Sequence, residues 1–248
     1  MKAIILAAGR GNRMKMLTGN QPKCFTELHG KRLIDWQLEA LHSAGISQIA
    51  IVRGYSGDSF KFDVTYFDNP RWAQTNMVQS LLCAAEWLRE FECIVSYSDI
   101  VYGPKTVQRL VECPAEISIT YDPNWFKLWS MRFKEPLSDA ETFQLDEADQ
   151  IVEIGNRAKN VDEIQGQYMG LLKFSPQGWR STENFLEKLS QAEIDRLDMT
   201  KLLQSLASNG INIRAVPVND GWLEVDSEYD LGIYNKLLSD RKGIIWWR

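Results

Sequence analysis

The chain has 248 residues, of which 44% are hydrophobic and 25% are charged, and its formal net charge is −5. This composition is typical of a globular protein with one large core. No apolar run approaches the ~20 residues that a membrane-spanning helix requires, so membrane insertion is not expected. The acidic balance argues against nucleic acid as a partner. The four scattered cysteines show no C-x-x-C spacing, which indicates a cytoplasmic protein without a zinc site.

The first predicted element is a strand over residues 2–7, whose uninterrupted apolar run is typical of a strand buried on both faces of a parallel sheet. A glycine-containing loop follows, in which small residues let backbone N–H groups approach an anion closely. Residues 9–32 carry six Lys or Arg side chains and one Glu. A basic loop on an acidic protein indicates a polyphosphate site.

Apolar runs and helical periodicities then alternate up to about residue 120. The predicted strands are 49–52, 64–66, 93–97 and 117–120, and the predicted helices are 33–44, 76–90 and 104–112. This alternation predicts βαβ units. The expected fold is therefore α/β, with a Rossmann-like, doubly wound, mostly parallel sheet that carries helices on both faces.

The alternation breaks at Pro123. Residues 123–161 are rich in Trp, Phe and acidic side chains, with short strand-like pieces at 142–145 and 151–154, and they predict a lid-like insertion. A core strand at 168–174, helices at about 176–190 and 199–208, a strand at 211–216 and a last helix from about 228 to 238 follow. No repeat or linker interrupts the chain, so residues 1–248 are expected to form one domain.

The spacing of the Gly, Arg and Lys residues in the first loop indicates which kind of polyphosphate site the loop forms. The P-loop pattern is missing, and the dinucleotide fingerprint G-x-G-x-x-G fails at its third glycine. The loop instead contains Gly9-x-Gly11-x-Arg13, and Pro22-Lys23 follows nine residues later. This pattern resembles the G-x-G-x-R…P-K signature of the nucleotidyltransferases that activate sugar phosphates and alcohol phosphates with an NTP.

Two carboxylates are placed to bind a metal ion. Asp99 lies just past the predicted strand 93–97, and Asp226 follows a short apolar strand and precedes a helix. Carboxylates that meet at one edge of a sheet suit Mg²⁺, which prefers oxygen ligands. From the pattern alone, Asp226 fits a helix N-cap equally well, and Asp99 a strand-end turn. The resemblance favours the metal, since the family places a metal-binding Asp at each point.

Further segments resemble the branch that contains phosphocholine cytidylyltransferases and the enzymes that put CMP on 2-aminoethylphosphonate. These segments are 68–70, 75–77 with 80–81, 137–142, 166–170 and 198–200. The resemblance implies that residues from the first strand, the basic loop and the helix after residue 75 bind the nucleotide: Leu6, Ala8 and Gly9 at the base and ribose, Gly11 in the loop, Arg13 and Lys23 at the triphosphate, and Asn76 and Ser80 at the pyrimidine.

The acceptor end is predicted in and after the insertion. Aromatic residues, Trp129 among them, stand beside acidic residues such as Glu141, and this combination suits an alkylammonium group. The same composition fits a solvated acidic lid whose aromatic side chains pack on the sheet. The resemblance adds Tyr168 and Asp198 as acceptor-binding candidates. A buried carboxylate suits an amino group and aromatic walls suit choline, so both acceptors stay open.

Together these features predict a Mg²⁺-dependent nucleotidyltransferase that transfers CMP from CTP to a phosphate or phosphonate acceptor and releases pyrophosphate. The acceptor is expected to carry an amino or choline-like group. The catalytic residues would be Arg13, Lys23, Asp99 and Asp226. A sugar-1-phosphate nucleotidyltransferase and a non-catalytic NTP-binding module are the alternatives. The apolar residues 244–247 pack on this subunit or on another, which leaves an oligomer open.

Overall fold

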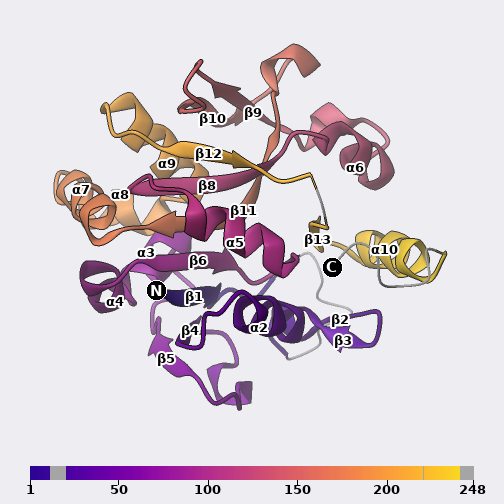
Figure 1. Ribbon diagram of the computed structural model, residues 1–248. Helices are drawn as coiled ribbons and strands as arrows, with labels where there is room; N and C mark the ends of the chain where they lie inside the picture. Colours follow the sequence, from indigo (N-terminus) through magenta and orange to yellow (C-terminus); the bar gives the residue numbers. More distant parts are fainter. Residues whose placement is uncertain (12–20, 220, 241–248) are drawn as a thin grey trace.

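The computed structural model describes residues 1–11, 21–219 and 221–240. Its centre is a seven-stranded sheet that draws strands from both ends of the chain (Figure 1). The strands in spatial order are β12 (Arg214–Pro217), β8 (Ile117–Asp122), β11 (Gln167–Phe174), β6 (Cys93–Tyr97), β1 (Lys2–Ala7), β4 (Ile49–Arg53) and β5 (Thr65–Asp68). β11 runs antiparallel to both of its neighbours, and every other pair in this sheet is parallel. The predicted α/β class and mostly parallel sheet are confirmed.

Helices cover both faces of this sheet, because its central strands are apolar on both sides. Ile4, Ile5 and Val95, on the two central strands, are completely buried. One face carries α2 (Leu33–Ser43) and α5 (Pro104–Glu112). The other carries α3 (Met77–Leu82), α4 (Ala85–Glu90), α7 (Pro176–Leu186), α8 (Gln191–Arg196) and α9 (Met199–Ser208). The single helix predicted over 76–90 is therefore two helices, α3 and α4.

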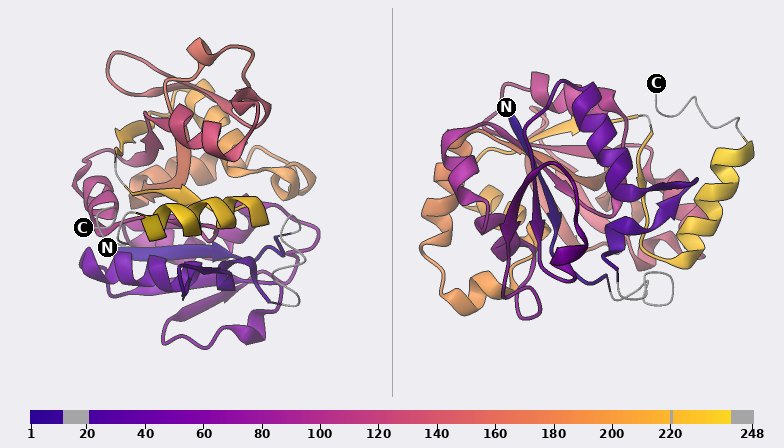
Figure 2. Two further views of the ribbon diagram at one scale, coloured as in Figure 1. Left: turned by 90° about the vertical axis from the view of Figure 1, so that its right-hand side faces the viewer. Right: turned by 90° about the horizontal axis from the view of Figure 1, so that it is seen from below.

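The remaining elements gather at the end of the sheet where β1 and β6 finish. The hairpin of β2 (Glu27–Leu28) and β3 (Lys31–Arg32) and the last helix α10 (Glu228–Asp240) lie there, and α10 contacts both β2 and α6 (Trp125–Arg132) (Figure 2). The short strands β7 (Ile100–Val101) and β13 (Leu223–Glu224) pair antiparallel. The insertion predicted over 123–161 contains α6, which the sequence analysis missed, and the hairpin of β9 (Glu141–Leu145) and β10 (Ile151–Arg157), which packs on α9.

Candidate active site

The loop after β1 needs glycine at residue 11. Gly11 has φ +67°, and a Cβ atom there would lie 2.7 Å from the Cβ of Lys23. A larger residue would therefore be strained and would displace the lysine. At the start of the loop, the carbonyl of Ala8 accepts a hydrogen bond from the backbone N–H of Tyr55 (2.9 Å), which fixes the backbone there. Arg13, predicted to bind the triphosphate, lies outside the described residues.

Lys23 lies between the two predicted metal-binding carboxylates. Its Nζ donates to Asp99 Oδ2 (2.8 Å) and to Asp226 Oδ1 (2.5 Å), although the three residues are far apart in the sequence. Burial opposes the charge on Lys23, but the two carboxylates outweigh burial and raise its pKa. The structure therefore brings three of the four predicted catalytic residues together, with the lysine protonated.

A backbone link joins the two carboxylate-bearing turns. Asp99 stands between β6 and β7, and Asp226 follows β13. Pairing of β7 with β13 brings the turns together, and the backbone N–H of Val225 donates to the carbonyl of Asp99 (2.9 Å). Gln37, a completely buried residue of α2, donates to the carbonyls of Tyr97 and Ile100 on either side of the first turn. These hydrogen bonds hold the backbone of the turn in place and so fix the position of the Asp99 Cα atom.

Asp226 is not the cap of α10, which was one interpretation of its position. Ser227 precedes the first helical residue, and its Oγ accepts from the backbone N–H of Asp230 (3.1 Å). Asp230 Oδ2 accepts from the backbone N–H groups of Ser227 (2.9 Å) and Asp226 (3.0 Å). This reciprocal arrangement is a capping box. The carboxylate of Asp226 is left to face the site.

Arg132, at the end of α6, holds the acidic residues of this turn together. Its side chain has no exposed surface and donates to Glu224 Oε2 (2.7 Å), Asp226 Oδ2 (3.4 Å) and Asp230 Oδ1 (3.1 Å). Burial and the charge of Asp226 raise the pKa of Glu224 to about 7, against the opposite effect of Arg132. Arg132 was missed in the sequence analysis, because nothing in the pattern marks one arginine of an aromatic segment as buried.

The two carboxylates suit Mg²⁺, although they supply only part of a coordination shell. Asp99 Oδ1 is buried and has no hydrogen-bond partner in the described part of the chain, so an acceptor oxygen is available there. The described residues contain no group of three or more His, Cys, Asp or Glu side chains arranged for a metal ion. Mg²⁺ commonly uses one or two carboxylates and completes its shell with water and phosphate oxygens.

Four cavities adjoin one another around this centre through shared residues. We name them the base, central, acceptor and outer cavities. The base cavity, about 120 Å³, is lined by Leu6, Ala8, Gly9, Trp72, Thr75, Asn76, Met77 and Ser80. The central cavity, about 280 Å³, shares Leu6, Gly9 and Met77 with it and adds Gly11, Lys23, Tyr97, Ser98, Asp99 and Asp226. All of the described residues predicted to bind the nucleotide therefore line one of these two cavities.

The acceptor cavity, about 350 Å³, shares Met77, Tyr97 and Asp226 with the central cavity. The four predicted acceptor residues all line it: Trp129, Glu141, Tyr168 and Asp198. Gln167, Thr200 and Glu224 also line it, although none of them was predicted to bind the acceptor. Gln167 and Thr200 lie in segments that carry the family resemblance. The outer cavity, about 430 Å³, adjoins it through Asp139 and Glu141.

The polar groups of the acceptor cavity differ in how far they are already paired. Asp198 caps α9, where its Oδ1 accepts from the backbone N–H of Lys201, and its Oδ2 pairs with Lys201 Nζ (2.8 Å). The Glu141 carboxylate has no hydrogen bond or ion pair with any described residue, and burial raises its pKa. The buried indole N–H of Trp129 also has no partner among these residues. The buried hydroxyl of Tyr168 likewise has no hydrogen-bond partner in the described part of the chain, so the cavity offers the unpaired Glu141 carboxylate and two unpaired donors.

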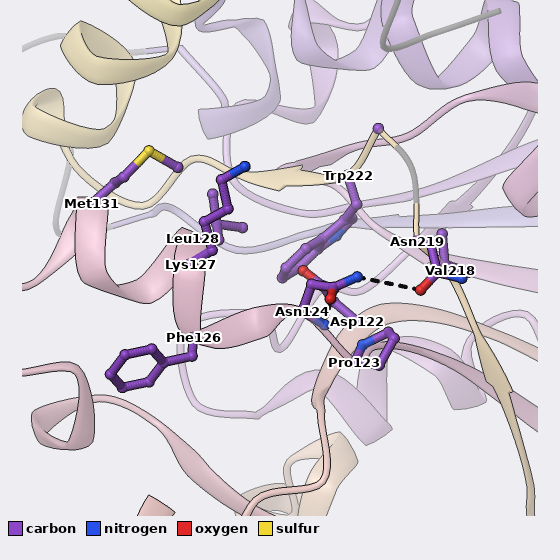
Figure 3. A pocket seen from close by; sticks show the side chains of 11 residues that line it. Asp122, Pro123, Asn124, Phe126, Lys127, Leu128, Met131, Val218, Asn219 and Trp222 are labelled. Atoms are coloured by element: carbon purple, nitrogen blue, oxygen red, sulfur yellow. Dashed lines mark hydrogen bonds between the residues drawn. The ribbon is translucent and has the colours of Figure 1, made fainter.

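A larger cavity of about 500 Å³ lies between residues of α6 and the segment that carries Trp222 (Figure 3). Trp222 lines this cavity and stacks on Trp129 of the acceptor cavity, with ring centroids 5.9 Å apart. Asp122 also lines it, and burial raises the pKa of this carboxyl to about 6. None of the predicted site residues lines this cavity, so its size does not mark the site of the chemistry.

The chain is similar to several known proteins. A family model described as MobA-like NTP transferase domain matches residues 3–141. CTP:phosphoglutamine cytidylyltransferase of Campylobacter jejuni is 40% identical over 94% of this chain and 98% of its own length. Choline-phosphate cytidylyltransferase of Streptococcus pneumoniae is 40% identical over 36% of this chain and 41% of its own length. The solved inositol-1-phosphate CTP transferase of T. maritima shares the fold, with a TM-score of 0.76, 18% identity and 98% and 97% coverage of the two chains.

Proposed function

Because the chain belongs to the MobA-like NTP transferase family and is a nucleotidyltransferase of the cytidylyltransferase branch, we propose that it transfers CMP from CTP to a phosphorylated acceptor that carries an amino group. The observation that carries the proposal is the row of adjoining cavities with Lys23, Asp99 and Asp226 at its centre. A nucleotide at one end and an acceptor at the other would meet at these three side chains. The non-catalytic module is set aside, since the family is one of enzymes.

The base cavity favours a pyrimidine over a purine because its volume is small, about 120 Å³. Ser80 is buried there, and its Oγ accepts from Asn69 Nδ2 (3.0 Å), so the hydroxyl hydrogen remains to donate to a base. Asn76 caps α3 with its Oδ1, which accepts from the backbone N–H of Met77 (2.8 Å). The side chain is therefore held in place at the edge of the cavity.

The reaction we propose forms a bond between an acceptor phosphate oxygen and the α-phosphorus of CTP, while the bond to the leaving pyrophosphate breaks. A phosphate group is largely ionised near neutral pH, since its second pKa is about 6, so no general base is required. The main barrier is repulsion between two anions, which preorganised positive charge reduces. Lys23 is protonated and lies in the central cavity, where it would face the transferred phosphoryl group.

Asp99 and Asp226 are the proposed ligands of Mg²⁺, with Asp99 Oδ1 as an available oxygen. Bound Mg²⁺ would neutralise phosphate charge during the transfer. Arg132 and the β7–β13 pair hold the two carboxylates in position for it.

The acceptor cavity fits a small cation joined to a phosphate or phosphonate. Glu141 supplies an unpaired carboxylate for an ammonium group, and Trp129 supplies an aromatic wall. The rings of Tyr97 and Tyr168 contact edge to face, with their centroids 5.7 Å apart. Burial raises the pKa of both hydroxyls, so both remain neutral. The relative of similar length acts on phosphoglutamine, whose amino group meets this description, and we propose an acceptor of that kind.

The test measures pyrophosphate release from CTP and from UTP. The acceptors are phosphoglutamine, phosphocholine, 2-aminoethylphosphonate and glucose 1-phosphate, each offered separately. We expect release with CTP, an amino-bearing acceptor and Mg²⁺, and loss of release with EDTA or in the Asp99→Asn variant. Release with the sugar phosphate alone would contradict the proposal. Among the described residues, no helix combines the length and the apolarity that a membrane span needs. We propose a cytoplasmic location on the separate ground that all four cysteines are free thiols, as is usual in a reducing compartment.

A further inference from the structure

The pairing of β10 with β9 shifts register twice, and the second shift adds one residue to β10 at the edge of the acceptor cavity. Ile154 pairs with Phe143, and Arg157 pairs with Glu141, so three steps along β10 match two steps along β9. Gly155 lies in this bulge with φ +83°, and a Cβ atom there would lie 2.7 Å from the Cβ of Thr200. Only glycine fits this conformation and this contact, so the bulge is fixed by the packing of β10 on α9.

The bulge decides which side chain stands opposite Glu141. Ile154 and Phe143 both line the acceptor cavity, and Glu141 lies on the same face two residues before Phe143. In a regular ladder Asn156 would be the partner of Glu141. The extra residue places Arg157 there instead, and directly paired residues project from the same face of a hairpin. Arg157 and Glu141 accordingly line the same outer cavity.

Neither of these charged groups has a partner among the residues that the structure describes. The Arg157 guanidinium, like the Glu141 carboxylate, makes no hydrogen bond or ion pair with any residue in the described ranges. The other cation near Glu141 is Lys201, and it is paired with Asp198 at 2.8 Å. Where the acceptor and outer cavities meet, paired strand positions therefore carry the Glu141 carboxylate and the Arg157 guanidinium, neither of which is bonded to another described residue.

We propose that Arg157 and Glu141 together recognise the amino-acid end of the acceptor, with its α-carboxylate on Arg157 and its α-ammonium on Glu141. This inference rests on the proposed function and narrows its acceptor to a phosphorylated α-amino acid. A guanidinium binds a carboxylate through two parallel hydrogen bonds, which a lysine cannot do. An acceptor without a carboxylate, such as phosphocholine or 2-aminoethylphosphonate, would leave Arg157 unused.

The test compares phosphoglutamine with an analogue that lacks only the α-carboxylate, using CTP and Mg²⁺. For phosphoglutamine, we expect Arg157→Ala to raise KM about tenfold or more, the scale of one charged hydrogen bond, and to leave kcat nearly unchanged. Arg157→Lys should recover part of this loss. For the analogue, the wild-type KM should already be raised, and Arg157→Ala should not raise it further. Such a non-additive pair of changes identifies a direct contact.

Lys159→Ala is the matched control, since it removes an exposed positive charge two residues away that lines neither cavity. Its KM values should equal those of the wild type. An equal rise in KM for both acceptors in Arg157→Ala, or no rise for either, would overturn the inference. Turnover of 2-aminoethylphosphonate but not phosphoglutamine would also overturn it, and would leave standing the proposed transfer of CMP to an amino-bearing acceptor. No release from CTP with any acceptor would overturn both.

Discussion

Lys23 Nζ lies 2.5 Å from Asp226 Oδ1, and its contact with Asp99 at 2.8 Å makes it the shared cation of both carboxylates. The Lys23 side chain is only 9% exposed. Its position is fixed from one side by the carboxylates and from the other by the close approach of Gly11. Charge and packing thus place one ammonium group at the centre of the site.

Replacing Lys23 with Ala should lower the turnover number by about 10²–10³-fold, the scale of losing one preorganised charge donor. The loss follows because the variant lacks the cation that offsets repulsion between CTP and the acceptor. Pyrophosphate release under saturating substrates measures it. Lys31→Ala is the control, because Lys31 pairs with the exposed Glu39 and lines none of the four cavities. Turnover of Lys23→Ala within threefold of the control would contradict the assignment.

Replacing Arg132 with Met should destabilise the protein by about 3–5 kcal/mol, since it leaves Glu224 and Asp230 without their buried cation and Asp226 with Lys23 alone. Urea unfolding at pH 7.5 measures the change. Arg89→Met is the matched control, because Arg89 pairs with Glu183 but is 60% exposed, and surface pairs contribute about 0–1 kcal/mol. Equal losses in the two variants would show that Arg132 does not hold the acidic turn together.

Replacing Gly11 with Ala should reduce turnover, because the new methyl group would meet Lys23 at 2.7 Å. Gly45→Ala provides the comparison, since Gly45 has φ +88° and a Cβ atom there has no neighbour within 4 Å. Both variants carry a left-handed alanine, which costs about 1–2 kcal/mol. Thermal unfolding should show similar losses, whereas only Gly11→Ala should lose activity. Equal activities would remove the argument that this glycine positions Lys23.

Asp122 should make stability depend on pH. Burial raises its pKa to about 6, above its ordinary value of about 4. A group whose pKa is raised by folding stabilises the protein fully below its unfolded pKa, and this contribution is lost as pH rises through the folded pKa. Asp122→Asn removes the titration. The variant's unfolding free energy relative to the wild type should therefore be higher at pH 7.5 than at pH 4, as measured in urea. A pH-independent difference would contradict this account.

Local patterns were sufficient to predict most of the sheet. The runs at 2–7, 49–52 and 93–97 are apolar on both faces, and they form β1, β4 and β6. The family resemblance then located the site residues, which no local pattern could bring together. Helix α6 was missed, although Trp125, Trp129 and Phe133 recur at a four-residue spacing that is typical of a helix face. Pro123 and the acidic residues beyond it favoured a lid of short strands instead.

The supporting contacts could not be predicted, because they depend on tertiary packing. In the sequence, Gln37 is a polar residue on an apolar helix face, which does not predict burial. In the structure it is completely buried and donates hydrogen bonds to two carbonyls beside Asp99. The bulge in β10 depends on contact between Gly155 and Thr200, which are separated in sequence by a strand and two helices. Sequence reasoning therefore identified groups that carry charge at the site and missed those that hold them.

The two ends of the site come from different stretches of the chain. Residues between Leu6 and Ser80 line the base cavity, whereas most of the acceptor cavity and all of the outer cavity are built from residues between 129 and 226. Substitutions in the later stretch can alter which compound receives CMP without disturbing the donor end. Descendants of one ancestral enzyme could in this way diverge toward new products while retaining the same activated nucleotide.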